Sequence, residues 1–522
     1  MKHFRNIAVI GISTMGSRLL GLLRDILIFA ALGTSLWNSA FILAFTLPNL
    51  FRRLLGEGAL TSAVVPIFTD VLKRQGKEVA FQFFNQVLLR LGIILFFTVA
   101  VGVLTLTVLN RSEVLTGRWA LGAELSVMLL PYMIFICLAA IISAGLNVIG
   151  RFAAAALTPV LLNLAMIAAL ACGLLWNAGE RQVVYFLCAG VLLGGLLQLL
   201  LPAWDFMRQG WRPKLATENS EFVGQVWTLF LPGLMGAAIL QINILVSRLL
   251  AFSLDEASVS LLYLASRLME LPLGVFTIAV VTVFFPLLAS AVTDADKAGF
   301  AAAFNQGTRL ILAISVPAGV GLIVLAEPII ALLFKWGSFS THDVAEALPL
   351  LAIYAFGLPF YSIATFATRG LHASKDMASP VRIAGICLMI NAIAGLVLMQ
   401  FFGAVGLAAA NVLAAIIQSA LLWRILSRSI DAICLRPLLR PCLQIGMAAL
   451  LMALAVLGTK LLCQEVANFQ SLKARHALVV AFGLPLGALT YLALLSLFRF
   501  QDIEALKNLI FRKLRKNDAV CL

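Results

Sequence analysis

The feature that most constrains this chain is a succession of fourteen apolar stretches, each long enough to cross a lipid bilayer. A spanning helix needs about 20 mainly apolar residues. The stretches cover 7–32, 37–68, 82–109, 120–147, 155–176, 182–204, 222–250, 257–290, 305–333, 345–371, 380–402, 405–427, 441–463 and 477–498. Hydrophobic residues make up 62% of the chain and charged residues 12%, whereas a soluble domain is about half apolar and about a quarter charged. The sequence therefore predicts an all-α polytopic membrane protein of about fourteen transmembrane helices.

Two of the spans, 37–68 and 257–290, are too long for one straight crossing. Each contains an internal proline, Pro48 in the first and Pro272 in the second. Proline cannot donate a backbone hydrogen bond and it kinks a helix. We therefore expect both spans to be bent.

The distribution of lysine and arginine predicts the orientation. With the N-terminus inside, the inside loops and tail hold about 23 basic residues and the outside loops about 8, as the positive-inside rule requires. An even number of spans then places both termini in the cytoplasm of a multi-pass protein. This pattern accounts for most of the net charge of +14, so nucleic acid is not an expected partner. The basic tail at 511–520 is expected either to lie on anionic headgroups or to be solvated.

A repeat relates the two halves of the chain. A proline followed 18 residues later by the triplet FNQ occurs at Pro66 and Phe84, and again at Pro286 and Phe304. The offset of 220 residues equals six spans, and an even number of spans keeps both copies in one orientation. Such parallel repeats are related by a pseudo-two-fold axis along the membrane normal. The predicted divisions are a six-helix lobe at 1–215, a second at 216–435, and two extra helices with the basic tail at 436–522.

Seven arginines fall within or beside the spans, although a charge near the bilayer centre costs at least about 2.5–3.5 kcal/mol. They are Arg18, Arg24, Arg52, Arg53, Arg90, Arg267 and Arg309. Arg90 and Arg309 lie close to an inside end, where their side chains are expected to extend to the interface.

The remaining five arginines belong to polar helix faces. At about 100° per residue, the first span places Ser17, Gly21 and Arg24 on one face with Arg18 beside it. The second span contributes Asn49, Arg52, Arg53 and Glu57, and the eighth contributes Tyr263, Arg267 and Glu270. Arg52 and Arg53 point about 100° apart, so at most one of them faces a shared cavity squarely.

These five arginines outnumber the intramembrane acids Asp25, Glu57 and Glu270 by two. One interpretation is a set of ion pairs that hold helices together, such as Arg267 with Glu270 or Arg53 with Glu57. The other is a cationic cavity between the two halves that accepts a phosphate-bearing molecule, because the planar guanidinium donates two parallel hydrogen bonds to phosphate.

The motifs of enzymes are missing. The sequence has no GxxxxGK[ST] loop for nucleotide hydrolysis, no catalytic His/Cys/Asp cluster, and no CxxC pair among its eight cysteines. No catalytic residue, metal or cofactor is expected. The prediction is a carrier driven by the membrane potential or by an ion gradient, with sodium, proton and chloride all open as the coupling ion.

Three segments resemble a known family. They are STMGSRLLGLLRD at 13–25, AFTLPNLFRRLLGEGALTSAVVPIF at 44–68 and LLYLASRLMELPLGVF at 261–276. They are similar to the MurJ family of lipid II flippases, which belongs to the multidrug/oligosaccharidyl-lipid/polysaccharide exporter superfamily. The resemblance implies a monomer in the bacterial inner membrane that moves the lipid-linked peptidoglycan precursor, lipid II, from the cytoplasmic to the periplasmic leaflet by alternating access. Membrane lipids and the cell-wall synthesis machinery are further implied partners.

The resemblance also implies roles for particular residues. The arginines of the cavity that meet the pyrophosphate correspond to Arg18, Arg24, Arg52 and Arg267. The supporting cavity or gate residues are Ser17, Asp25, Asn49, Arg53, Glu57, Tyr263 and Glu270. The last two spans, 441–463 and 477–498, correspond to a groove for the polyprenyl tail.

The sequence departs from the family at two places. Ser39 and Ser266 stand where relatives often have an acid. Some relatives bind sodium through acids in the seventh and eleventh spans, where this chain offers Gln241, Asn243 and Asn391 but no carboxylate.

Three alternative functions remain open. A flippase for another undecaprenyl-linked glycan would share the fold and differ in its headgroup pocket. A drug/cation antiporter would require acids in the cavity in place of arginines. A non-transporting scaffold of wall synthesis would tolerate substitution of Arg24 and Arg52.

Overall fold

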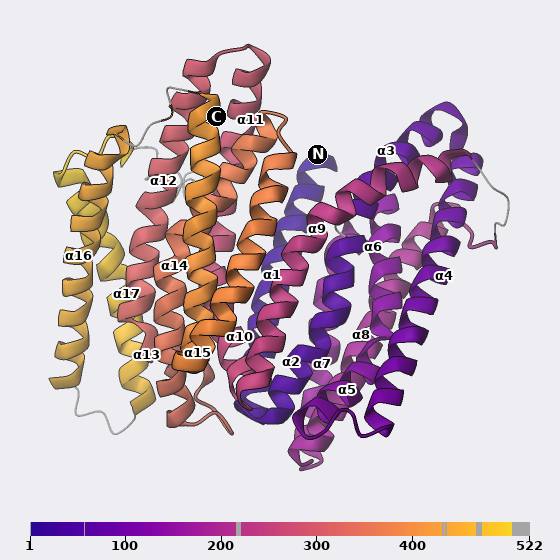
Figure 1. Ribbon diagram of the computed structural model, residues 1–522, viewed down its shortest axis with the longest axis horizontal. Helices are drawn as coiled ribbons and strands as arrows, with labels where there is room; N and C mark the ends of the chain where they lie inside the picture. Colours follow the sequence, from indigo (N-terminus) through magenta and orange to yellow (C-terminus); the bar gives the residue numbers. More distant parts are fainter. Residues whose placement is uncertain are drawn as a thin grey trace. The chain divides into compact units, whose positions relative to one another are not determined.

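The computed structural model describes residues 2–56, 58–215, 221–430, 433, 436–465 and 472–503. Every regular element in these ranges is a helix (Figure 1), which confirms the predicted all-α class. The chain divides into two compact units. The first comprises residues 1–260 with 336–340, and the second comprises 261–335 with 341–522.

The described part of the first unit contains nine α-helices and one π-helix. In chain order they are α1 (Lys2–Leu32), α2 (Leu36–Phe51), the π-helix η1 (Arg52–Gly56), α3 (Ala59–Arg74), α4 (Gly76–Arg111), α5 (Arg118–Leu129), α6 (Tyr132–Val148), α7 (Ala153–Leu175), α8 (Glu180–Arg208) and α9 (Glu221–Leu254).

The second unit begins within α10, and it also contains a π-helix early in its order. Its elements are α10 (Ser258–Pro272), the π-helix η2 (Leu273–Thr277), α11 (Ile278–Thr293), α12 (Lys297–Val324), α13 (Ala326–Phe334), α14 (Thr341–Ala373), α15 (Ala378–Ser429), α16 (Arg436–Glu465) and α17 (Leu472–Leu497).

The described helices account for the predicted spans. Eleven of them are long and apolar enough to cross a membrane, or twelve if the bent pair α5 and α6 is counted as one crossing. α15 contains two predicted spans, because Gly403 interrupts it with a φ of 56°. α1 is 31 residues long and carries Arg18 and Arg24 among its apolar residues. Dividing α15 and adding α1 would give the predicted number, and the exact count of fourteen stays a prediction.

The two long spans change helix type next to their prolines. In the second span Pro48 lies inside α2, and η1 follows directly. In the eighth span Pro272 ends α10, and η2 follows it. A proline lacks the N–H that the α-helical ladder needs, and a π-turn is a frequent cause of helix bending. Both spans thus contain a π-helical segment next to a proline, and the bend expected in each stays a prediction.

The repeated FNQ triplet occupies equivalent packing environments in the two units. The rings of Phe84 and Phe304 are both fully buried. A Cβ on Gly145 of α6 would lie 2.9 Å from the Phe84 ring, and a Cβ on Gly370 of α14 would lie 3.2 Å from the Phe304 ring. In each unit a glycine on the next span thus makes room for the corresponding phenylalanine, as a parallel repeat requires.

Polar contacts to backbone carbonyls tie the end of α9 into the first unit. The Ser39 hydroxyl on α2 donates to the carbonyl of Glu256. The Arg118 guanidinium at the start of α5 donates to the carbonyl of Phe252 at 3.2 Å. The first unit therefore includes all of α9. The predicted divisions at 1–215, 216–435 and 436–522 follow the sequence repeat, whereas the two units are defined by compactness. The predicted divisions therefore stay a prediction.

A short segment between α13 and α14, which we call the strap (Trp336–Ser340), packs within the first unit. The Ser338 N–H donates to the Ala30 carbonyl at the end of α1 at 2.8 Å. Two glycines permit this approach, since a Cβ on Gly337 would lie 2.2 Å from the Ala30 oxygen and one on Gly33 would lie 2.8 Å from the Ser338 oxygen. Both have a positive φ, +55° and +56°, which glycine adopts without steric cost.

Replacing Gly337 by alanine is expected to displace the strap. Gly117 has the same positive φ of +56°, but no atom lies within 4 Å of a Cβ placed there. Gly117→Ala should therefore lose only the roughly 1–3 kcal/mol of unfolding free energy that a sparsely populated backbone conformation costs, whereas Gly337→Ala adds a clash with a carbonyl oxygen. Thermal melting of the two purified variants compares them. Equal melting temperatures would show that the strap is not closely packed.

An ion pair joins α12 to the turn after α17. Arg309 Nε lies 2.6 Å from Asp502 Oδ2, and the two side chains are 11% and 6% exposed. Gln306 donates to the other carboxylate oxygen at 3.2 Å. Arg309 thus has a carboxylate partner 193 residues away in the chain, and the expectation that its side chain extends to the interface stays a prediction.

Candidate functional site

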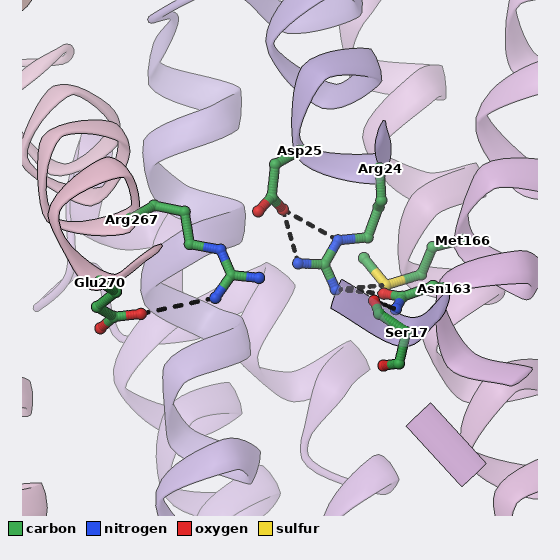
Figure 2. Close-up of polar contacts among 7 residues, drawn as sticks. All are labelled: Ser17, Arg24, Asp25, Asn163, Met166, Arg267 and Glu270. Carbon is green, nitrogen blue, oxygen red and sulfur yellow. Dashed lines mark hydrogen bonds and ion pairs between the residues drawn. The ribbon is translucent and has the colours of Figure 1, made fainter. Parts of the chain in front are cut away.

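The centre of the site in the first unit is the guanidinium of Arg24 on α1. Arg24 is 9% exposed and Asp25 is 2% exposed. Asp25 Oδ1 accepts hydrogen bonds from Arg24 Nη2 at 2.6 Å and from Nε at 3.1 Å, so the carboxylate covers that edge of the guanidinium (Figure 2). A buried charge requires such partners because it has lost its hydration. The pair explains how α1 carries an arginine within a membrane span.

The other edge of the Arg24 guanidinium meets α7. Arg24 Nη1 donates to Asn163 Oδ1 at 3.0 Å and lies 3.8 Å from the thioether sulfur of Met166 (Figure 2). Asn163 is 5% exposed. Asn163 is not among the residues predicted from the sequence, although it is a lone amide within the apolar span 155–176, which is a signal that could have identified it.

The other predicted residues of α1 lie on either side of this arrangement. The backbone carbonyl of Ser17 accepts from Asn163 Nδ2 at 3.1 Å, so Ser17 contributes through its backbone. Arg18 is exposed. The structure therefore brings Ser17, Arg24 and Asp25 together around Asn163 and leaves Arg18 on the surface of α1.

The second span presents its polar residues in different ways. The Asn49 amide donates to the Phe45 carbonyl of its own helix at 2.9 Å. Arg52 is partly buried and Arg53 is exposed, a difference that agrees with two neighbouring residues on different sides of a helix. Glu57 lies outside the described residues, so its pairing with Arg53 stays a prediction.

The predicted residues of the second unit form an ion pair along α10. Arg267 Nη1 lies 3.6 Å from Glu270 Oε2, with side chains 32% and 53% exposed (Figure 2). This confirms the pairing of these two residues that the sequence analysis named. Such half-exposed pairs contribute little to stability. Tyr263 lies one turn earlier and is partly buried, and its carbonyl accepts from the Ser266 hydroxyl at 2.9 Å.

The two positions that depart from the family pattern hold neutral hydrogen bonds. Ser39 is fully buried and uses its hydroxyl to join α2 to the Glu256 carbonyl. Ser266 uses its hydroxyl within its own helix. Both side chains are neutral. Among the described residues, the acids that pair with the predicted arginines are Asp25, beside Arg24, and Glu270, beside Arg267.

Among the described residues, one group of side chains has metal-ligand atoms close to one another. His342, Asp343 and Glu346 lie in the first turn of α14, and their ligand atoms are within 4.8 Å of each other. His342 Nε2 lies 3.8 Å from Glu346 Oε1, and both side chains are exposed. None of the predicted site residues belongs to this group, and the expectation of no metal stays a prediction.

Comparison with known proteins connects this arrangement to a family. Residues 28–476 match the family model of the lipid II flippase MurJ. A probable lipid II flippase MurJ of Vibrio cholerae is 33% identical over 517 residues, covering 95% of this chain and 97% of its own length. One from Rhizobium meliloti is 35% identical over 437 residues, covering 81% and 80%.

Solved structures agree with the sequence comparison. A lipid II flippase MurJ in an inward closed conformation matches with a TM-score of 0.77 at 25% identity, covering 97% of this chain and 99% of that structure. An inward-facing multidrug resistance transporter of the MATE family, from the MOP superfamily, shares the fold with a TM-score of 0.65 at 16% identity, covering 82% and 98%. The chain thus shares its fold with both solved structures, and the family model and the curated relatives show its family: it belongs to the MurJ family of lipid II flippases.

Proposed function

We propose that this protein moves lipid II from the cytoplasmic to the periplasmic leaflet of the bacterial inner membrane by alternating access, and that its arginines bind the pyrophosphate. The observation that carries the proposal is the buried Arg24 guanidinium, held between polar groups of α1 and α7. A structural ion pair alone is often no more stabilising than an apolar pair of the same size. Binding of an anionic group explains why an arginine, and not an apolar residue, occupies this position.

The chemistry of the guest fits the guanidinium. The two neighbouring donors Nε and Nη2 of Arg24 both bond to one carboxylate oxygen of Asp25, and a phosphate is bound by the same fork of donors. A diphosphate that replaces the carboxylate would keep the guanidinium neutralised within the membrane. Arg18, Arg52 and Arg267 are the further cations we assign to the diphosphate, with Asn49, Arg53, Glu57, Tyr263 and Glu270 in supporting roles.

The membrane potential supplies a driving force. Moving one negative charge outward across an inside-negative membrane releases about 2.3 kcal/mol per 100 mV. The same field favours the inward return of an emptied cationic site. The polyprenyl tail stays in lipid during the movement, and α16 and α17 are the helices we assign to it, since many of their apolar side chains are exposed.

Transport of purified lipid II in proteoliposomes tests the proposal. With fluorescent lipid II in the inner leaflet, the reconstituted protein should expose the label to a membrane-impermeant quencher outside, and faster when a potassium gradient with valinomycin sets the interior negative. If the transport rate is the same with and without the potential, the membrane potential does not drive transport. Absence of transport at any potential would overturn the proposed function.

Substrate choice separates the leading proposal from its alternative. The same vesicles are loaded with an undecaprenyl diphosphate that carries an O-antigen unit. Preference for lipid II supports the proposal, and equal or faster transport of the O-antigen substrate supports a flippase for another glycan. The monomeric state, the cytoplasmic termini, the wall-synthesis partners and the coupling ion remain part of the proposal.

A further inference from the structure

Asn163 on α7 is bonded to α1 at two points that lie two helical turns apart. Its Oδ1 accepts from Arg24 Nη1 at 3.0 Å, and its Nδ2 donates to the Ser17 carbonyl at 3.1 Å. The amide therefore uses both its acceptor and its donor on the same helix. Because Asn163 is 5% exposed, loss of these bonds would leave buried polar groups of α1 without that partner.

The two sides of the Arg24 guanidinium have partners of different charge. Asp25 supplies a carboxylate to Nε and Nη2, whereas Asn163 supplies a neutral carbonyl oxygen to Nη1. A carboxylate competes directly with an incoming phosphate, because both are anionic acceptors for the same fork of donors. A neutral amide fixes the guanidinium without cancelling its charge.

We infer that Asn163 is a positioning residue, which holds Arg24 by Nη1 and aligns its Nε/Nη2 edge while a diphosphate replaces Asp25 there. This inference rests on the proposed function. It adds that Asn163 keeps its bond to Arg24 during binding, whereas Asp25 is exchanged for the diphosphate. Met166 lies one turn from Asn163 on α7, and its sulfur is 3.8 Å from Nη1. The same edge of the guanidinium is therefore bounded by two side chains of α7, neither of which carries a charge.

Direct binding of geranylgeranyl diphosphate to the purified full-length protein in detergent tests the inference. Asn163→Leu keeps the volume and removes both hydrogen bonds, and we expect it to raise the Kd by about tenfold or more, since a hydrogen bond to a charged group is lost. Asn85→Leu is the matched control. Asn85 is 6% exposed and also makes two hydrogen bonds, to the Arg212 carbonyl at 2.9 Å and from the Trp211 indole N–H at 2.8 Å. Its loss should lower the melting temperature and leave the Kd within about twofold.

Two variants close in size to the native residues provide a second readout. Asn163→Asp adds a carboxylate beside Arg24 and cannot donate to Ser17, so the Kd should rise by more than in Asn163→Leu. Asp25→Asn removes the competing carboxylate, so the Kd should fall by about fivefold. Opposite changes from two substitutions around one guanidinium are not expected from a general loss of packing.

The outcomes separate this inference from the proposed function. If the wild type binds the diphosphate and Arg24→Ala does not, but Asn163→Leu behaves as Asn85→Leu does, the inference is wrong and the proposed function stands. An unchanged or higher Kd in Asp25→Asn would overturn the exchange. If Arg24→Ala binds as the wild type does, the diphosphate site is elsewhere and both proposals fail.

Discussion

Replacing Arg24 by alanine is expected to reduce lipid II transport by at least about 100-fold, which corresponds to about 2.7 kcal/mol of lost stabilisation. The variant removes the donors that face Asp25 on one edge and Asn163 on the other. Lysine at the same position keeps the charge but loses the planar fork, so Arg24→Lys should also transport poorly. The measurement is the rate of lipid II transport in proteoliposomes, with growth of a flippase-depleted bacterium as the cellular readout.

Stability must be separated from function in this test. Arg24→Ala leaves the carboxylate of Asp25 buried without the arginine, and Asp25 is 2% exposed. Breaking one side of a buried ion pair costs about 3–5 kcal/mol. The double variant Arg24→Ala with Asp25→Ala also removes this carboxylate, and it should recover membrane abundance without recovering transport. Arg74→Ala, at an exposed arginine paired with Asp70, is the control for loss of a basic residue. Normal transport by the double variant would refute the role of Arg24.

The second large effect is expected in the second unit, at the ion pair between Arg309 and Asp502. Asp502→Ala leaves the Arg309 side chain, 11% exposed, without its carboxylate. The expected loss of unfolding free energy is about 3–5 kcal/mol, seen as a fall of about 3–5 °C in the melting temperature in detergent. Transport per folded molecule should be little affected, because neither residue is among those assigned to the diphosphate.

Asp70→Ala is the matched control for this pair. Arg74 Nε and Asp70 Oδ1 are 2.7 Å apart, close to the 2.6 Å of the Arg309 pair, but their side chains are 77% and 54% exposed. Solvent weakens such a pair to about 0.3–0.5 kcal/mol. The double variant Arg309→Leu with Asp502→Leu should recover most of the lost stability. If Asp70→Ala and Asp502→Ala melt at the same temperature, burial does not strengthen the Arg309 pair.

Much of the fold follows from local properties of the sequence. The length and apolar content of each stretch predict the spans, and Pro48 and Pro272, from which bends were expected, each lie next to a π-helix. Gly403, which divides α15 with a φ of 56°, lies in the gap expected between 380–402 and 405–427. The FNQ repeat predicted equivalent halves, and the buried rings of Phe84 and Phe304 have equivalent glycine neighbours.

The partners of the intramembrane arginines could be predicted only where they are close in sequence. Glu270 is three residues from Arg267, and helical geometry alone brings the two side chains together. Asn163 is 139 residues from Arg24 and Asp502 is 193 residues from Arg309. Nothing in the periodicity of either span identifies those partners.

The sequence by itself determined that this protein is a bundle of membrane-spanning helices, that it repeats, and that it keeps arginines where lipid would exclude them. In hydrocarbon, the backbone N–H and C=O groups of a helix can form hydrogen bonds only within that helix. Span length and composition therefore suffice to predict spanning helices. Only the tertiary structure decided which groups neutralise Arg24 and Arg309 and that the strap reaches the end of α1. Those contacts depend on how distant helices pack, because a hydrogen bond requires its partners to lie within about 3 Å of each other.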